Sequence, residues 1–425
     1  MKVCVQGLWH LGSVTAAALS FLGHEVIGFD REESIIRSLS SGKCPISEFG
    51  VDNYLSEGIS NGNLSFTSDY EVLKSKDIHT LWVCYDTPVN DNDEADCGFV
   101  INNIIETIPF LSSNIQIIIS SQLPIGSIKK LEDLCAVLFK DKSINFVCSP
   151  ENLRLGSALN VFLHPDRIVV GVRNIQCKNK VSDLFNSISS NIEWMSVESA
   201  EMTKHAINSF LATSVVFANE IASICELNGA DAKEVERGLK TDQRIGQKAY
   251  LSPGKAFSGG TLARDVEFLK TKAVGIDVPL INSIKESNDY HKSWTERKII
   301  SLFDDLACLK IAVWGITYKS GTDTLRRSLP VEMCDWLISR GSHLNIYDPA
   351  VKILPDRWDS KVSHFQDPIL SLSNVDVLLI GTEYKEFKSI LKDYVNTQLT
   401  VIDSNRLLPF LQNSVGRYVS VGSPK

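Results

Sequence analysis

The sequence predicts an α/β protein with two Rossmann-like, doubly wound domains joined by a central helical region with one long helix. Three observations predict this fold class. Residues 2–30 follow a strand, glycine turn, helix, strand pattern, residues 199–227 keep helical apolar spacing without a breaker, and residues 309–315 open a second strand and glycine turn. Because 425 residues exceed what one hydrophobic core usually supports, two or three domains are expected. The pattern along the chain divides it into residues 1–195, 196–295 and 296–425.

The first domain begins with a βαβ unit. Strand Lys2–Gln6 is followed by the turn Gly7–Gly12, an alanine-rich helix and strand Glu25–Asp30. Further buried-strand patterns alternate with helical stretches, at Thr80–Cys84, Gln116–Ser120, Asn145–Cys148 and Arg167–Gly171. This alternation favours a parallel sheet covered on both faces.

Beyond residue 195 the pattern is first helical and then α/β again. A long helix is expected from Ser199 to about Leu227, followed by helices over Asp231–Leu239 and Leu262–Val274. The last third opens with strand and turn Leu309–Gly315, and continues with a helix and three strands at Pro330–Ser339, Leu344–Tyr347, Val375–Ile380 and Leu399–Ile402. A second, smaller α/β domain follows from this order.

Composition and charge narrow the function classes. A net charge of −8 and a pI near 5.6 argue against nucleic acid as the main partner, because phosphate binding needs a basic surface. The ten cysteines show no CxxC and no His/Cys spacing suited to zinc, which predicts reduced thiols, no metal site and a cytoplasmic protein. No apolar run is long enough to span a bilayer and Met1 opens no secretory signal, so no membrane partner is expected.

The turn between the first strand and helix carries the signature of a dinucleotide site. Gly7 and Gly12 can bring backbone N–H groups to a pyrophosphate, and Asp30 ends the next strand, where it can accept hydrogen bonds from a ribose. Asp30 favours NAD over NADP, although the neighbouring Arg31 keeps that choice open. Trp9 replaces the middle glycine, so an α/β turn without a nucleotide stays the alternative on this segment.

Several segments, taken in order, carry a family resemblance. They are Ser149–Ala158, Phe162 and Pro165–Gly171, then Lys204, Asn208, Phe210–Ala212 and Asn219–Glu220, then Arg244–Gly246 and Phe257–Asp265, and finally Tyr318–Lys319, Thr322–Asp323, Arg326, Ser328, Tyr347–Pro349 and Thr382–Tyr384. Over nearly the whole chain they resemble the UDP-glucose/GDP-mannose dehydrogenase family, whose members oxidise the C6 alcohol of a nucleotide sugar to a carboxylate with two NAD. The resemblance implies NAD as cofactor, a nucleotide-sugar substrate, most often a UDP-sugar, and a homodimer paired through the helical region.

The same resemblance implies a catalytic set. Lys204 and Asn208 would face the reacting carbon, where an ammonium and an amide can stabilise an oxyanion, and their spacing of four puts both on one helix face. Asp265 would orient a water for base catalysis, and Glu151 would help to hydrolyse the acyl intermediate. Taken singly, Lys204 and Asn208 would be read as ordinary helix-surface residues.

The resemblance also implies ligand contacts. The cofactor-binding set is Gly7, Trp9, His10, Leu11, Gly12, Asp30, Arg31, Thr87 and Arg326. The substrate-binding set is Leu153, Arg154, Arg244, Tyr250, Phe257, Gly259 and Lys319. Within these sets Lys319 resembles a substrate-contacting lysine, Arg326 a residue that meets the cofactor across the cleft, and Arg244 one that reaches the substrate of the partner subunit.

One position breaks the pattern. Thr261 stands where the family has the cysteine whose thiolate adds to the C6 aldehyde, and a threonine hydroxyl is a far poorer nucleophile at neutral pH. Further departures are Gln122, Leu155, Ala263 and Arg264. The product could therefore be an aldehyde, or an acid made by direct oxidation of the hydrated aldehyde. Epimerisation through a transient ketone, a binding homologue without turnover, and Cys148 as a substitute thiol are the remaining alternatives.

Overall fold

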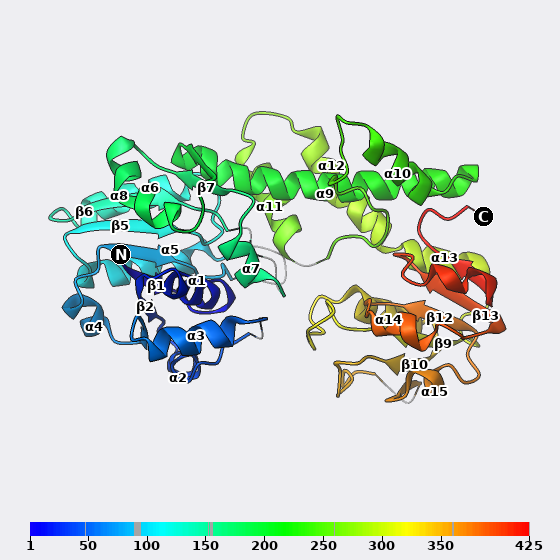
Figure 1. Cartoon of the computed structure of the whole chain (residues 1–425). Coiled ribbons are helices and arrows are strands. Elements are labelled where there is room, and N and C mark those ends of the chain that lie inside the picture. Colours follow the sequence, from blue (N-terminus) through cyan, green and yellow to red (C-terminus); the bar gives the residue numbers. More distant parts are fainter. Residues whose placement is uncertain are drawn as a thin grey trace. The chain divides into compact units, whose positions relative to one another are not determined.

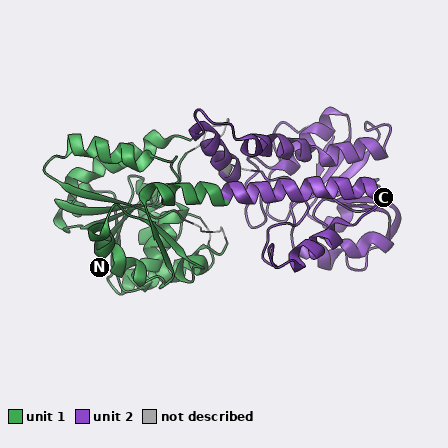
Figure 2. Cartoon of the chain, turned by 90° about the horizontal axis from the view of Figure 1, so that it is seen from above, with its two compact units in different colours: residues 1–207 green, residues 208–425 purple. Residues whose placement is uncertain are grey.

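The computed structural model describes residues 1–46, 48–88, 95–151, 153, 156–258, 260–358 and 361–424. These residues form two compact units, residues 1–207 and 208–425, each built around one sheet with helices packed on it (Figures 1 and 2). The two units are described separately below. The division into three functional parts remains a prediction.

Unit 1 holds an eight-stranded sheet in the order β3-β2-β1-β4-β5-β6-β7-β8. Its strands are β1 Lys2–Gln6, β2 Glu25–Phe29, β3 Leu64–Thr67, β4 Thr80–Val83, β5 Asn114–Ile119, β6 Ser143–Cys148, β7 Ile168–Gly171 and β8 Ile192–Met195. Neighbouring strands are parallel except β6 and β7, which pair antiparallel through Cys148 and Gly171. The sheet is therefore parallel as predicted, except that β7 and β8 run opposite to the other strands. An antiparallel neighbour does not need the long crossover connection that a parallel one requires.

Helices cover both faces of this sheet (Figure 1). They are α1 His10–Phe21, α2 Glu33–Ser40, α3 Val51–Ser60, α4 Tyr70–Ser75, α5 Cys97–Thr107, the 3-10 turn η1 Ile108–Phe110, α6 Ser127–Leu138, α7 Ala158–Leu163 and α8 Ile175–Asn186. Along β1, Val3 and Val5 belong to one buried cluster and Cys4 to another. This alternation explains why the strand reads as a continuous apolar run, since both of its faces are covered.

A single long helix, α9 Val197–Asn228, runs from unit 1 into unit 2 (Figure 2). It agrees with the predicted long helix to within two residues at its start. Among the described residues it is also the one helix long and apolar enough to cross a membrane by length and composition. That match is weak, because 44% of its apolar window is buried inside the protein and a core helix meets the same criteria.

Unit 2 contains the remaining elements. Its helices are α10 Ala232–Thr241, α11 Gly260–Lys272, α12 Pro279–Lys292, α13 Trp294–Leu302, α14 Leu329–Ser339, α15 Pro368–Ser371, α16 Glu386–Ile390 and the 3-10 helix η2 Pro409–Asn413. Its strands are β9 Lys310–Trp314, β10 His343–Tyr347, β11 Val362–His364, β12 Val377–Ile380, β13 Asn396–Asp403 and β14 Val415–Val419. The sheet order β11-β10-β9-β12-β13-β14 is that of a Rossmann fold, in which the order reverses beside the first strand.

The predicted fold class is thus confirmed: two parallel-sheet α/β folds are linked by a helical region with one long helix. In both sheets a glycine turn follows the first strand, at Gly7 and at Gly315, where φ is +86° and +81°. These turns place each helix start at the carboxyl edge of its sheet, the edge at which ligands of such folds bind.

Candidate active site

The glycine loop of unit 1 holds α1 close against β1. A Cβ built on Gly12 would lie 1.9 Å from the backbone oxygen of Gly7, and one built on Gly7 would lie 2.7 Å from the ring of Tyr85. Either side chain would displace the loop or the helix. The two glycines therefore serve the tight turn and the close helix packing that a dinucleotide site requires.

The loop fits a dinucleotide despite its tryptophan. Trp9 is the N-cap of α1 with φ of −72°, a value open to any residue, and 46% of it is exposed, so the indole is not buried within the loop. No side chain caps the start of α1 and its first turn carries no acidic residue. Backbone N–H groups at such a helix start suit the pyrophosphate of NAD, which when bound supplies the acceptor for a hydride.

The acidic residue after β2 is already engaged with the loop. Asp30 is buried, and its Oδ2 accepts a hydrogen bond of 2.7 Å from the backbone N–H of Leu8. Arg31 forms an exposed ion pair with Glu106 at 2.5 Å. Leu11 is buried against the sheet, and the hydroxyl of Thr87 donates to the backbone oxygen of Gln122 at 2.6 Å. Except for Arg326, the whole predicted cofactor set lies in unit 1.

Replacing Gly12 with alanine is expected to destabilise unit 1 and to weaken NAD binding. The added methyl must push the Gly7 oxygen aside, and overpacking of this kind costs about 1–3 kcal/mol. Thermal unfolding and calorimetric titration with NAD measure both effects. Gly238→Ala is the matched control, because a Cβ there meets nothing within 4 Å in the middle of α10, where alanine should be neutral or slightly stabilising. Equal behaviour of the two variants would contradict the packing role of Gly12.

Lys204 and Glu151 meet inside unit 1. The ammonium of Lys204 donates to the backbone oxygen of Glu151 at 2.6 Å and lies 3.3 Å from its carboxylate Oε1, while Oε2 accepts from the backbone N–H of Leu153 at 2.6 Å. Lys204 is buried and the Glu151 side chain is 25% exposed. The loop after β6 thus holds a cation in a fixed place, where it can stabilise a developing oxyanion.

Asn208 and Asp265 meet inside unit 2. The amide of Asn208, one helical turn beyond Lys204 on α9, donates a hydrogen bond to Oδ2 of Asp265 on α11. Both side chains are buried, and Asp265 is fully enclosed. An amide that orients a buried carboxylate is the arrangement expected of a base or of a group that holds a water.

Thr261 lies in the first turn of α11, one turn before Asp265, and its side chain is exposed. Cys148 at the end of β6 is enclosed instead, and burial, reinforced by Glu201 and Glu198, raises the pKa of its thiol far above the usual range. A thiol held in the protonated form is a poor nucleophile. The geometry therefore gives no support to Cys148 as a substitute for the missing cysteine.

The predicted substrate residues are spread over several loops. Arg244 is exposed and pairs with Asp242 at 2.7 Å, and Tyr250 is exposed as well. Phe257 exchanges two hydrogen bonds with Asn288 on α12, which fixes the loop ahead of Thr261. Lys319 is exposed, and Arg326 lines a cavity of about 280 Å³ at the start of α14. Arg154, Leu155 and Gly259 lie outside the described residues.

Two buried glutamates near these groups were missed from the sequence. Glu48 accepts hydrogen bonds from the backbone N–H groups of Gly156 and Ala158 and lies 3.0 Å from His10, so it ties the glycine loop to the loop after β6. Burial alone would raise the pKa of Glu48, but His10 and the two N–H groups outweigh it and hold the pKa below its usual range. No sequence pattern near Glu48 identifies it as a site residue. Glu201 could have been included, because it lies one turn before Lys204 on the same helix.

Comparison with known proteins connects these features to a family. Residues 1–189 match the NAD binding domain of the UDP-glucose/GDP-mannose dehydrogenase family, residues 198–290 match its central domain, and residues 312–409 match its UDP binding domain. The matches follow the order of the fold, with the glycine loop in the first, α9 and α11 in the second, and the sheet of unit 2 in the third.

Individual relatives match this chain over at least 93% of their own length. The chain is 30% identical to a UDP-glucose 6-dehydrogenase of Rickettsia typhi, with 100% of both chains covered, and 29% identical to UDP-glucose 6-dehydrogenase TuaD of Bacillus subtilis, covering 100% of this chain and 93% of that one. Among solved structures, a UDP-glucose dehydrogenase from Pyrobaculum islandicum superposes with a TM-score of 0.87 at 25% identity, covering 99% and 98% of the two chains. The chain belongs to the UDP-glucose/GDP-mannose dehydrogenase family and is an NAD-dependent oxidoreductase that acts on a CH–OH group.

Proposed function

We propose that this protein is a UDP-sugar 6-dehydrogenase that oxidises the C6 alcohol with NAD and releases the aldehyde as its main product. The UDP binding domain and the UDP-glucose 6-dehydrogenase relatives support a UDP-sugar as substrate. The observation that carries the proposal is the hydroxyl of Thr261 in the first turn of α11, one turn before the Asn208–Asp265 pair.

Apart from the NAD that accepts the hydride and one water, the first oxidation needs only groups that this chain has. As the C6 hydride leaves, the hydroxyl proton must also leave. Lys204, held by Glu151, stabilises the C6 oxygen as negative charge develops on it. Asp265, oriented by Asn208, receives the proton through a water. No covalent bond between enzyme and substrate is required up to the aldehyde.

The second oxidation is where this chain differs. A hydride can leave an aldehyde carbon only after a nucleophile has added to it. The alkoxide of Thr261 is scarcely populated at neutral pH without a strong adjacent base, whereas a cysteine thiol is already a few per cent thiolate near pH 7. We therefore expect the covalent route to the acid to be slowed by orders of magnitude.

The test is product analysis with the purified protein, NAD and a panel of UDP-glucose, UDP-N-acetylhexosamines and GDP-mannose. We expect one NADH for each sugar turned over, and mass spectrometry should show an aldehyde or its hydrate as the main product. Two NADH for each sugar, with the acid as the main product, would overturn the assignment of the aldehyde as product. The proposal that the protein is a 6-dehydrogenase would still hold.

Two other functions would give different results in the same assay. An epimerase that works through a transient ketone would convert the sugar without net NADH. A binding homologue would retain the sugar nucleotide without product. The Lys204–Glu151 and Asn208–Asp265 pairs favour the dehydrogenase, because a pure binding scaffold has little need for either.

We further propose a cytoplasmic homodimer paired through α9. All ten cysteines are free thiols, which suits a reducing compartment. On α9, Phe210, Phe217 and Ile224 recur every seven residues and are 71%, 46% and 55% exposed. An apolar stripe of this kind on a helix supports a self-complementary contact. Exposed Arg244 would then be available to the substrate of the partner subunit.

Replacing both Phe210 and Phe217 with aspartate is expected to weaken dimerisation by roughly 10³-fold or more, since central aromatic anchors contribute about 2 kcal/mol or more each, which is about 30-fold for each residue. Light scattering across a concentration series measures the mass. Ile353→Asp is the control, because Ile353 is 78% exposed and does not belong to α9. A dimer that survives the double replacement would place the interface elsewhere.

A further inference from the structure

Unit 1 contains a small, partly open cavity between the loop after β5 and helix α9. Its volume is about 20 Å³, and its polar lining includes Ser121, Glu151, Glu201, Lys204 and His205. A cavity needs roughly 10–15 Å³ of such volume and several polar neighbours to hold one water. This cavity meets both conditions, and two of its lining residues are the Lys204–Glu151 pair.

The walls of the cavity are fixed by contacts within unit 1. Both carboxylate oxygens of Glu201 accept backbone hydrogen bonds, from Gly126 at 2.7 Å and from Ile128 at 3.1 Å, and Nε2 of His205 lies 2.9 Å from the backbone oxygen of Leu123. Burial raises the pKa of Glu201, while these N–H groups partly oppose that rise. The loop after β5 is thus clamped to α9 on either side of Lys204.

One polar atom in this lining lacks a partner. Ser121 is 7% exposed, and its hydroxyl oxygen is buried without a hydrogen-bond partner among the described residues. Buried polar atoms in folded proteins are almost always hydrogen-bonded, either to protein or to an ordered water. A hydroxyl without a protein partner, on the wall of a cavity the size of one water, marks a water site.

We propose that this cavity binds a single water on the hydroxyl of Ser121, and that this water is the nucleophile of a slow second oxidation. The inference rests on the proposed 6-dehydrogenase function. The bound water would lie next to Lys204, which the proposed function assigns to the C6 oxygen, and next to Glu151, which holds Lys204. It supplies the nucleophile that Thr261 does not.

The step balances without a covalent enzyme intermediate. The water oxygen forms a bond to the aldehyde carbon, one water proton passes to the carboxylate of Glu151, and the carbonyl oxygen takes a proton from Lys204. The product is the hydrated aldehyde, and Glu151 returns its proton to Lys204. Loss of the C6 hydride to a second NAD and of one proton then gives the acid, so one aldehyde, one water and one NAD become one acid, one NADH and one proton.

The test compares Ser121→Ala with Ser209→Ala in the full-length protein. Ser209 on α9 is also buried with an unpartnered hydroxyl, but it does not line this cavity, so the two variants remove the same group. Crystal structures of the wild type and both variants report the water directly. Product analysis after incubation with NAD and UDP-glucose gives the ratio of acid to aldehyde.

We expect density for one water within hydrogen-bond distance of the Ser121 hydroxyl in the wild type and in Ser209→Ala, and none in Ser121→Ala. The ratio of acid to aldehyde should fall by roughly tenfold or more in Ser121→Ala alone. A dry cavity in the wild type, or an equal ratio in the two variants, would overturn the inference while the first NADH still forms. Absence of any NADH in the wild type would instead overturn the proposed function, and the catalytic role of this water with it.

Discussion

Lys204→Ala is expected to lower NADH formation by roughly 10²–10³-fold at saturating substrate, the usual effect of removing one donor to an oxyanion. The ammonium is buried and is held by the backbone oxygen of Glu151 at 2.6 Å, so it is in place before the substrate binds. A positioned charge in a site that excludes water acts more strongly than the same charge in bulk solvent. Both kcat and kcat/KM should fall, because the interaction matters most in the transition state.

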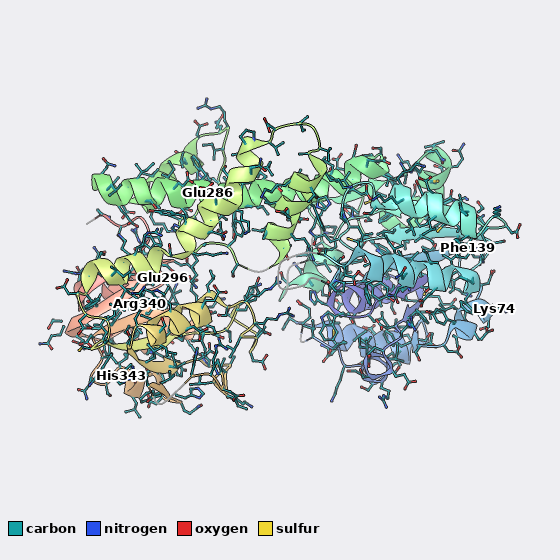
Figure 3. The ribbon with its side chains drawn as sticks, turned by 180° about the vertical axis from the view of Figure 1, so that it is seen from behind. Lys74, Phe139, Glu286, Glu296, Arg340 and His343 are labelled. Atoms are coloured by element: carbon teal, nitrogen blue, oxygen red, sulfur yellow. The ribbon has the colours of Figure 1, made fainter. Side chains whose placement is uncertain are left out.

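The control for this experiment is Lys74→Ala. Lys74 on α4 is labelled in Figure 3. Its side chain is 67% exposed, and it forms a loose pair with Glu71 at 3.9 Å. Thermal unfolding of both variants shows whether a lower rate of NADH formation reflects lost catalysis or a destabilised fold. NADH formation by Lys204→Ala at the rate of Lys74→Ala would remove Lys204 from the mechanism.

The elements that were predicted well have strong local signals. The predicted strand Lys2–Gln6 has the bounds of β1, because a run buried on both faces ends at a glycine turn. The long helix was predicted within two residues of α9, since its apolar spacing is uninterrupted. Strands β3, β8, β11 and β14 were missed because they are short and only partly buried, with no long apolar run to mark them.

The members of the candidate site could be proposed from the sequence, but their pairings could not. The resemblance placed Lys204, Asn208 and Asp265 together in one functional set, and the spacing of the first two put them on one helix face. The hydrogen bond from Asn208 to Asp265 joins residues that are 57 positions apart in the sequence. The hydrogen bond from the N–H of Ala158 to Glu48 joins residues that are 110 positions apart. Contacts of such range depend on how elements far apart in the sequence pack together, which no local pattern records.

Thr261→Cys is expected to turn an aldehyde-forming enzyme into one that makes the acid. The new thiol would sit in the first turn of the thirteen-residue helix α11, which carries no acidic residue there. A helix start of this kind lowers a thiol pKa and raises the thiolate fraction. The thiolate adds to the aldehyde carbon, the hydride leaves, and water hydrolyses the resulting thioester. NADH formed for each sugar should rise from near one to near two, and acid formation should rise by more than about 100-fold.

Thr261→Ser is the matched control for that gain, because serine has the shape of cysteine but only a hydroxyl. It should behave like the wild type, since its alkoxide is as scarce as that of threonine. Mass spectrometry of acid-quenched Thr261→Cys should also reveal the substrate attached to the protein at residue 261. If Thr261→Cys and Thr261→Ser gave the same ratio of acid to aldehyde, a missing thiol would not be what sets the product. The cause would then have to lie in the other departures in these segments, such as Gln122 or Arg264.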